Sequence, residues 1–263
     1  MKVLAIITSG RKKGNTSMIA SFLLDRIKKL AIDEKKQLQV EKLFLSDYEL
    51  KHCLGCRTCM DRGEEKCPLK DDLKEIKAKI DEAEAIIFGS PVYVGNVSSM
   101  MKALIDRLAY ICHRQEFYRK VAFVYSTSGG STNKQTNRTI AGALLSWGFN
   151  LLGTAGFIIK HHESEEKIEE LYTKKLDKIA EKVYRNVINE RYLTPSTLSL
   201  AMFKLQQRER ADPEKAHPLD YKYWKENGWK KTEANYYFEH QSSKFRTFLS
   251  IVLYKAISLL FVK

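Results

Sequence analysis

Continuous apolar runs alternate with helical patterns along the first part of the chain. Four such runs cover residues 2–8, 83–93, 120–125 and 151–159, and residues 38–45 alternate between apolar and polar positions. Continuous runs are typical of strands that are buried on both faces, whereas alternation is typical of strands covered on one face. The pattern therefore predicts five strands.

Between and after these strands, apolar residues recur every three or four positions, as on one face of a helix. This periodicity covers five segments, about residues 16–30, 72–83, 98–111, 136–148 and 165–187. Strands and helices that alternate at this spacing form crossovers, which give a parallel sheet with helices on both faces. We predict an α/β fold in which residues 1–190 form one doubly wound domain.

Beyond residue 190 the alternation stops, and we predict a helical, aromatic-rich C-terminal extension over residues 191–263. Residues 193–210 have helical periodicity, and the following residues interleave aromatic with charged side chains. Such a segment could stack nucleotide bases. An irregular segment anchored on the core or on a second subunit is the preferred interpretation, because the chain carries no known nucleic-acid motif.

The extension ends in a predicted amphipathic helix over residues 244–263. A wide apolar face is formed by Phe248, Leu249, Val252, Leu253, Ala256, Leu259 and Leu260. The opposite stripe consists of Thr247, Ser250, Tyr254, Lys255 and Ser258. The apolar run is shorter than the roughly 20 residues that span a bilayer, so we predict no transmembrane span. We favour a dimer contact for the helix, and a peripheral contact with an anionic membrane stays open.

Four of the five cysteines fall within one short segment, as Cys53, Cys56, Cys59 and Cys67. The first three follow the CxxCxxC spacing of bacterial ferredoxins, and Pro68 comes after the fourth, as it does in those proteins. This pattern indicates a four-iron four-sulfur cluster held by the four thiolates.

Two other interpretations of the cysteines stay open, namely structural zinc and thiols that bind nothing. Zinc usually takes two CxxC pairs set well apart, which this segment lacks. A disulfide framework needs an oxidising compartment, and the apolar run after Met1 and Lys2 is too short for a signal peptide. We therefore expect reduced thiols in a cytoplasmic protein. Cys112, in an apolar helical stretch, is interpreted as a packing residue.

The formal net charge of +13 points to an anionic partner. Lysine and arginine are mixed with acidic residues along the predicted helices, which argues against nucleic acid. We expect an acidic, ferredoxin-like electron-transfer protein as the partner, because complementary charge speeds association.

Three loops lie where predicted strands end, and loops of this kind bind ligands in doubly wound sheets. Residues 8–17 place small residues, hydroxyls and basic side chains before a helix, which favours an anion. The GK[ST] ending of a Walker loop is absent from this loop, which disfavours ATP chemistry. Residues 89–98 combine Pro91 and two glycines with Tyr93 and suit a flat ligand, and residues 126–131 lie at the same edge.

The combination of GRKKGNTS, the cysteine segment and GSPVYVGNVSSMMKALIDR resembles the NADPH-dependent FMN reductase branch of the flavodoxin-like proteins. The cysteine segment itself resembles that of the iron-sulfur flavoproteins within this branch. The resemblance implies a flavodoxin-like sheet of five parallel strands in the order 2-1-3-4-5. It also implies FMN, a cluster on the four cysteines, and a homodimer or homotetramer with flavin sites near the subunit contacts.

The same resemblance implies which residues bind the flavin. Those implied for the FMN phosphate are Ser9, Arg11, Asn15, Thr16 and Ser17. Those implied for the isoalloxazine ring are Pro91, Val92, Tyr93, Val94, Gly95 and Asn96, with Ser128, Gly129 and Gly130 as further candidates. No catalytic acid or base stands out.

We therefore expect an FMN-dependent oxidoreductase that moves electrons between a reduced donor, ferredoxin or NAD(P)H, and an acceptor. A plain NAD(P)H-dependent FMN or quinone reductase without a cluster, and a non-enzymatic electron carrier, are the alternatives.

Overall fold

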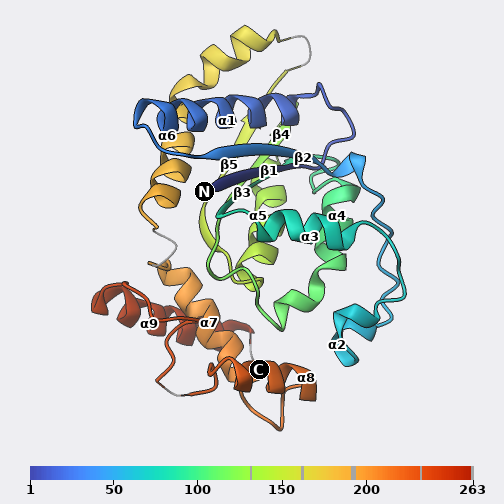
Figure 1. Cartoon of the computed structure of the whole chain (residues 1–263), viewed down its shortest axis with the longest axis vertical. Coiled ribbons are helices and arrows are strands. Elements are labelled where there is room, and N and C mark those ends of the chain that lie inside the picture. Colours follow the sequence, from blue (N-terminus) through green and yellow to red (C-terminus); the bar gives the residue numbers. More distant parts are fainter. Residues whose placement is uncertain (131, 161–162, 191–193, 232, 262–263) are drawn as a thin grey trace.

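The computed structural model describes the chain except residues 131, 161–162, 191–193, 232 and 262–263. Its centre is a parallel sheet in the order β2-β1-β3-β4-β5, which confirms the predicted fold (Figure 1). The strands are β1 (Lys2–Ile7), β2 (Gln39–Phe44), β3 (Ala85–Pro91), β4 (Val121–Ser128) and β5 (Asn150–Ile158).

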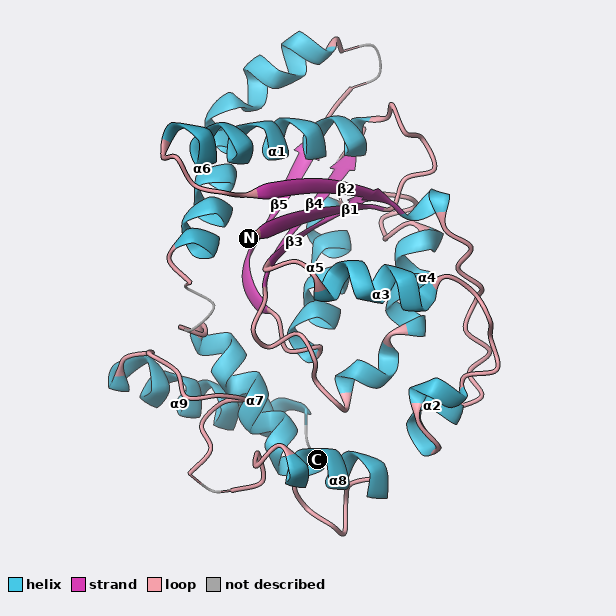
Figure 2. Ribbon diagram, viewed as in Figure 1, coloured by secondary structure: helices cyan, strands magenta, loops and turns pink. Residues whose placement is uncertain are grey.

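Helices cover both faces of this sheet (Figure 2). One face carries α1 (Asn15–Asp33) and α6 (Glu165–Ile188), and the other carries α3 (Leu73–Asp81), α4 (Ser99–Arg107) and α5 (Asn133–Ser146). Successive side chains of a strand point to opposite faces. Val3 and Ala5 accordingly belong to the core under α1 and α6, and Leu4 belongs to the core under the other three helices.

Some predicted boundaries were wrong. The predicted helix over residues 98–111 ends at Arg107, and a 3₁₀ turn, Ala109–Cys112, follows it. Strand β4 continues beyond the predicted residue 125 to Ser128, because Thr127 and Ser128 pair with β5. Polar residues at the end of a strand give no hydrophobic signal, although the pairing with a neighbouring strand extends through them.

Beyond α6 the extension consists of α7 (Thr197–Arg210), α8 (Pro218–Glu226) and α9 (Lys244–Phe261). Helix α8 corrects the prediction of an irregular aromatic segment: Pro218 occupies its first turn, and Nδ1 of His217 accepts a hydrogen bond from the Leu219 amide. A separate aromatic core forms around Phe203, Trp224 and neighbouring rings. The division into a domain over 1–190 and an extension over 191–263 stays a prediction.

The extension is attached to the sheet domain by hydrogen bonds. The indole of Trp224 donates a hydrogen bond of 2.9 Å to the carbonyl oxygen of His113. The hydroxyl of Tyr223 donates one of 2.7 Å to the carbonyl oxygen of Gln115. Among the described residues, no helix combines the length and the apolar character that crossing a membrane requires.

Candidate functional site

The loop after β1 presents free amides at the start of α1. Gly14 is the N-cap of this helix, and no side chain caps the first turn, which also contains no acidic residue. Within the described chain, the amides of Asn15, Thr16 and Ser17 have no hydrogen-bond acceptor. Such amides and the helix dipole favour an anion.

Two contacts with β4 fix the beginning of α1. The Thr16 hydroxyl lies 2.7 Å from the Thr127 hydroxyl, and the Tyr125 hydroxyl donates to the Thr16 carbonyl oxygen at 2.6 Å. The side chain of Thr16 is therefore engaged within the protein, whereas that of Asn15 is half-buried and makes no hydrogen bond to the described residues. Of the predicted phosphate ligands, Asn15 and Ser17 are thus the side chains left available at this helix end.

Ser9 and Arg11, the other predicted phosphate ligands, lie in the turn before the helix. Ser9 is buried, and its hydroxyl accepts a hydrogen bond of 3.2 Å from the Arg11 amide. The Arg11 side chain is exposed at the surface of this turn.

The loop after β3 forms a tight turn in which Tyr93 and Asn96 exchange backbone hydrogen bonds of 2.9 and 3.0 Å. Both central residues have positive φ, +50° at Val94 and +74° at Gly95. A β-branched residue in this region is strained, and strain of this kind gathers at ligand sites. Val94 is also fully exposed, so its side chain gains nothing from packing within the chain.

Hydrogen bonds join the three predicted loops at one edge of the sheet. The Val92 amide donates a hydrogen bond of 2.9 Å to the Thr127 carbonyl oxygen. The Thr136 hydroxyl donates one of 3.5 Å to the Gly95 carbonyl oxygen. In the loop after β4, the Ser128 hydroxyl donates to the Gly130 carbonyl oxygen at 2.6 Å. The residues predicted for the phosphate and those predicted for the ring are thus brought to the same edge.

The predicted cluster ligands surround one cavity of about 250 Å³. Cys53 and Cys56 are exposed, and Cys59 and Cys67 are half-buried. Helix α2 (Thr58–Asp61) places Cys59 in a helical turn inside this segment.

The surroundings of the thiols differ from one cysteine to another. The Thr58 hydroxyl lies 3.3 Å from the Cys56 sulfur and lowers the pKa of that thiol. Burial, together with the charges of Cys53 and Cys67, raises the pKa of the Cys59 thiol. Coupling of this kind places Cys53 and Cys67 within electrostatic range of Cys59, and a bound cation would relieve it.

The four cysteines around this cavity are of a residue type that binds both iron-sulfur clusters and structural zinc. A zinc ion holds each sulfur about 2.3 Å from one point. Among the described residues, no three His, Cys, Asp or Glu side chains are placed to hold one metal ion. The cavity volume is about 250 Å³, whereas one water needs only about 10–15 Å³ of such space. This volume exceeds what a single ion needs.

A buried ion pair supports one side of this cavity. The guanidinium of Arg107 donates to both carboxylate oxygens of Asp71 and to the Lys51 carbonyl oxygen, and one of its nitrogens lies 4.0 Å from the Cys67 sulfur. Burial raises the pKa of the Asp71 carboxyl, but the hydrogen bonds from Arg107 and from two amides outweigh it and lower the pKa. A positive charge is therefore held next to a predicted ligand.

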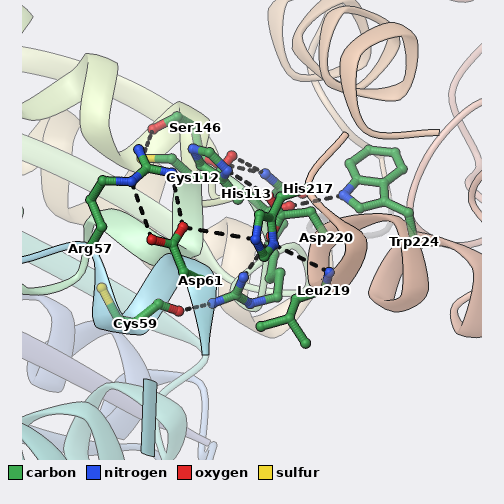
Figure 3. A network of polar contacts seen from close by, with 12 residues as sticks. Arg57, Cys59, Asp61, Cys112, His113, Ser146, His217, Leu219, Asp220 and Trp224 are labelled. Atoms are coloured by element: carbon green, nitrogen blue, oxygen red, sulfur yellow. Dashed lines mark hydrogen bonds and ion pairs between the residues drawn. The ribbon is translucent and has the colours of Figure 1, made fainter. Parts of the chain in front are cut away.

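The C-terminal extension is joined to the cysteine segment by a network of polar contacts (Figure 3). Arg114 donates to the carbonyl oxygen of Cys59 at 2.6 Å and to the carboxylate of Asp220, in α8, at 2.6 Å. His113 donates to the other oxygen of Asp220 at 2.7 Å. At the rim, His217 lies 3.9 Å from Asp61, which also pairs with Arg57.

Residues 1–164 match the family of NADPH-dependent FMN reductases. The chain belongs to this family. It is therefore a flavin-dependent oxidoreductase, and the match covers the sheet, the cysteine segment and the three loops at the sheet edge.

Several curated relatives carry the name iron-sulfur flavoprotein, and one from Methanosarcina acetivorans, 37% identical over 73 residues (27% of this chain and 35% of the relative), is named NAD(P)H dehydrogenase (quinone). One from Archaeoglobus fulgidus is 29% identical over 232 residues, which cover 87% of this chain and 100% of the relative. One from Methanosarcina thermophila is 32% identical and covers 53% of this chain and 69% of its own length. One from Methanocaldococcus jannaschii is 43% identical over 107 residues, 41% of this chain and 51% of the relative.

Solved structures share the fold at low identity. RosB, with a bound 8-demethyl-8-formylriboflavin-5'-phosphate, superposes with a TM-score of 0.57 at 17% identity, over 81% of this chain and 88% of RosB. An FMN-dependent NADH-azoreductase from Bacillus anthracis superposes with a TM-score of 0.51 at 12% identity, over 70% of this chain and all of that one.

The sequence did not predict several residues that shape the candidate site. Thr127 joins the first and second loops, and Arg114 and Asp220 join the cysteine segment to the extension. For Asp220, one feature of the sequence could have indicated a buried partner. This residue is a carboxylate within an aromatic segment, and a charge in such surroundings is rarely buried without a partner.

Proposed function

We propose that this FMN reductase binds FMN at the loops after β1, β3 and β4 and a four-iron four-sulfur cluster on Cys53, Cys56, Cys59 and Cys67. Electrons then pass between a reduced donor and an acceptor. The observation that carries the proposal is the single cavity that all four cysteines line. The names of the curated relatives support it.

For the flavin, we assign the phosphate to the beginning of α1 and the ring to the turn at residues 93–96. The free amides of the first turn of α1 suit a terminal phosphate. The strained turn presents Tyr93 and Val94 outward, where a flat ring system can lie against them. The first loop lacks the GxGxxG pattern of dinucleotide sites, which favours FMN over FAD.

When bound, FMN supplies two-electron chemistry and the cluster supplies one-electron transfer. The residues of the chain position these two groups. The salt bridge of 2.7 Å between Lys12 of the first loop and Asp47, just after β2, connects the flavin loop to the start of the cysteine segment. Arg107 places a positive charge beside the Cys67 sulfur, and hydrogen bonds to cluster sulfurs tune the reduction potential.

For the donor, we propose a small acidic ferredoxin-like protein. The net charge of +13 supports this assignment, because complementary charge raises association rates at low salt. NAD(P)H is the second candidate donor, and the name of the family favours it. With NAD(P)H as the only donor and cysteines that bind nothing, the protein would be a plain FMN or quinone reductase.

A homodimer or homotetramer in the cytoplasm completes the proposal. Exposed Tyr93 and Val94 at the ring site are placed where a second subunit can cover the flavin. Sedimentation of the holoprotein decides the number of chains, and a monomer would overturn this part.

An anaerobic reductive titration tests the proposed function. With both groups bound, the chain takes up about three electrons, two on the flavin and one on the cluster. The variant Cys56→Ser should take up about two and keep its FMN, because the sheet edge binds the flavin without the cysteines. Cys112→Ser is the matched control and should behave as the parent protein. An uptake of two electrons by the parent protein, purified without oxygen, would contradict the cluster.

A further inference from the structure

Helix α9 buries small polar side chains against the protein, and most of its described apolar side chains are exposed. It lies against α7, at the end of the molecule away from the sheet (Figure 1). Ser250 is 2% exposed and Ser258 is 9% exposed. The exposed apolar side chains are Phe245 at 70%, Phe248 at 61%, Leu249 at 39%, Ile251 at 38%, Val252 at 51% and Leu259 at 83%.

Five of these apolar residues, all but Ile251, form one continuous arc. Phe245, Phe248, Leu249 and Val252 are spaced by three or four residues, which places them on the same face of a helix. With a rise of 1.5 Å per residue, the 18 residues of α9 are about 27 Å long. Scattered apolar residues on a surface need no explanation, but a contiguous strip of this length marks an interaction site.

Basic side chains border the arc. On a helical wheel Lys244 and Lys255 lie along one border, and Arg246 lies on the other. All three are exposed, and no salt bridge to them occurs within the described part of the chain. Helix α9 contains no acidic residue.

We propose that α9 is a docking helix for the surface of an anionic lipid bilayer. Helices of this kind lie in the plane of the interface, with apolar side chains below the headgroups and basic residues beside them. Lysine and arginine have long stems that let their charges remain at headgroup level while the helix sinks.

A second copy of the chain fits the same arc less well. A two-fold contact places the same patch of each subunit against the other. Lys244 and Lys255 would then be buried between two helices that offer no carboxylate, and burying an unpaired charge is costly. The arrangement of charge therefore favours phospholipid over self-association.

Flotation of the full-length protein with vesicles tests this proposal. We expect binding to phosphatidylcholine vesicles that contain phosphatidylserine, and little binding to phosphatidylcholine alone. The triple variant Lys244→Gln, Arg246→Gln, Lys255→Gln should bind on the order of a hundredfold more weakly, since each basic residue near an anionic surface contributes about fivefold to binding.

The apolar arc is tested by Phe248→Ser combined with Val252→Ser, which should weaken binding at least about tenfold. Ile32→Ser combined with Leu171→Ser is the matched control, because these side chains are 64% and 60% exposed on α1 and α6. It should bind as the parent protein does.

Three results would overturn the proposal. They are no binding to the anionic vesicles, equal binding to both vesicle types, and equal loss in the control variant. Sedimentation that shows a dimer dissociated by Phe248→Ser with Val252→Ser, without vesicle binding, would assign the arc to a second copy instead.

Discussion

The Asp220 carboxylate accepts a hydrogen bond of 2.6 Å from Arg114, although 106 positions separate the two residues in the chain. Both side chains are almost fully buried, with 2% and 7% of their surface exposed. The same guanidinium holds the carbonyl oxygen of Cys59. Through this contact the C-terminal extension helps to fix the position of a proposed cluster ligand.

We expect Asp220→Asn to destabilise the protein by about 2–3 kcal/mol, because a buried guanidinium loses its counter-charge. Amide hydrogen exchange over residues 53–67 should also become faster. Urea unfolding and exchange mass spectrometry measure the two effects. Asp61→Asn, which removes an exposed partner of His217, is the control and should cost less than about 1 kcal/mol. Equal effects of the two variants would show that Asp220 has no special role.

The same carboxylate gives the stability a dependence on pH. Burial raises the pKa of Asp220, but the hydrogen bonds and charges of His113 and Arg114 outweigh it and lower the pKa. A lowered pKa in the folded state adds stability above the unfolded value, near 4, and this stability is lost as pH falls through the folded pKa. The difference in unfolding free energy between the parent and Asp220→Asn should therefore shrink below about pH 4. A difference that stays constant down to pH 2 would argue against this ion pair.

The strands and the cysteine segment could be predicted from the sequence because their signals are local. Val3 to Ile7 form a buried run, and the spacing of the cysteines is visible in the chain itself. Helix α8 was not predicted, because its aromatic and charged residues lack helical periodicity. It is held by Pro218 in its first turn and by packing of Trp224 in the aromatic core.

Contacts between segments far apart in the chain could not be predicted, because no local sequence pattern indicates them. Nothing near Thr16 indicates that its hydroxyl lies 2.7 Å from the Thr127 hydroxyl, so the sequence could not show this contact. The periodicity of α9 identified its two faces, but which face packs inward depends on α7.

Asn15→Ala combined with Ser17→Ala should weaken FMN binding on the order of a hundredfold, because two hydrogen bonds to a charged phosphate are lost. Riboflavin lacks the phosphate, so its affinity should change little. Fluorescence titration of the apoprotein with both flavins makes this comparison. The control is Ser21→Ala, about one turn further along α1, where the hydroxyl donates to the Ser17 carbonyl oxygen. An equal loss of FMN and riboflavin binding would show that the phosphate lies elsewhere.

Val94→Asn should stabilise the apoprotein by about 0.5–1 kcal/mol, because asparagine tolerates positive φ better than a β-branched residue does. The same change should weaken FMN binding if the Val94 side chain contacts the ring. Lys35→Asn is a matched control, because Lys35 has a φ of +53° at the end of α1. This variant should raise the free energy of unfolding without changing the affinity for FMN. If Val94→Asn leaves the affinity for FMN unchanged, this turn does not bind the isoalloxazine ring.

The most direct test of the central claim is the analysis of iron, acid-labile sulfide and zinc in protein purified without oxygen. A cubane on Cys53, Cys56, Cys59 and Cys67 predicts about four irons and four sulfides for each chain. Cys56→Ser should lose the iron and retain noncovalent FMN. One zinc for each chain without sulfide, or full retention of FMN with neither metal, would contradict the account.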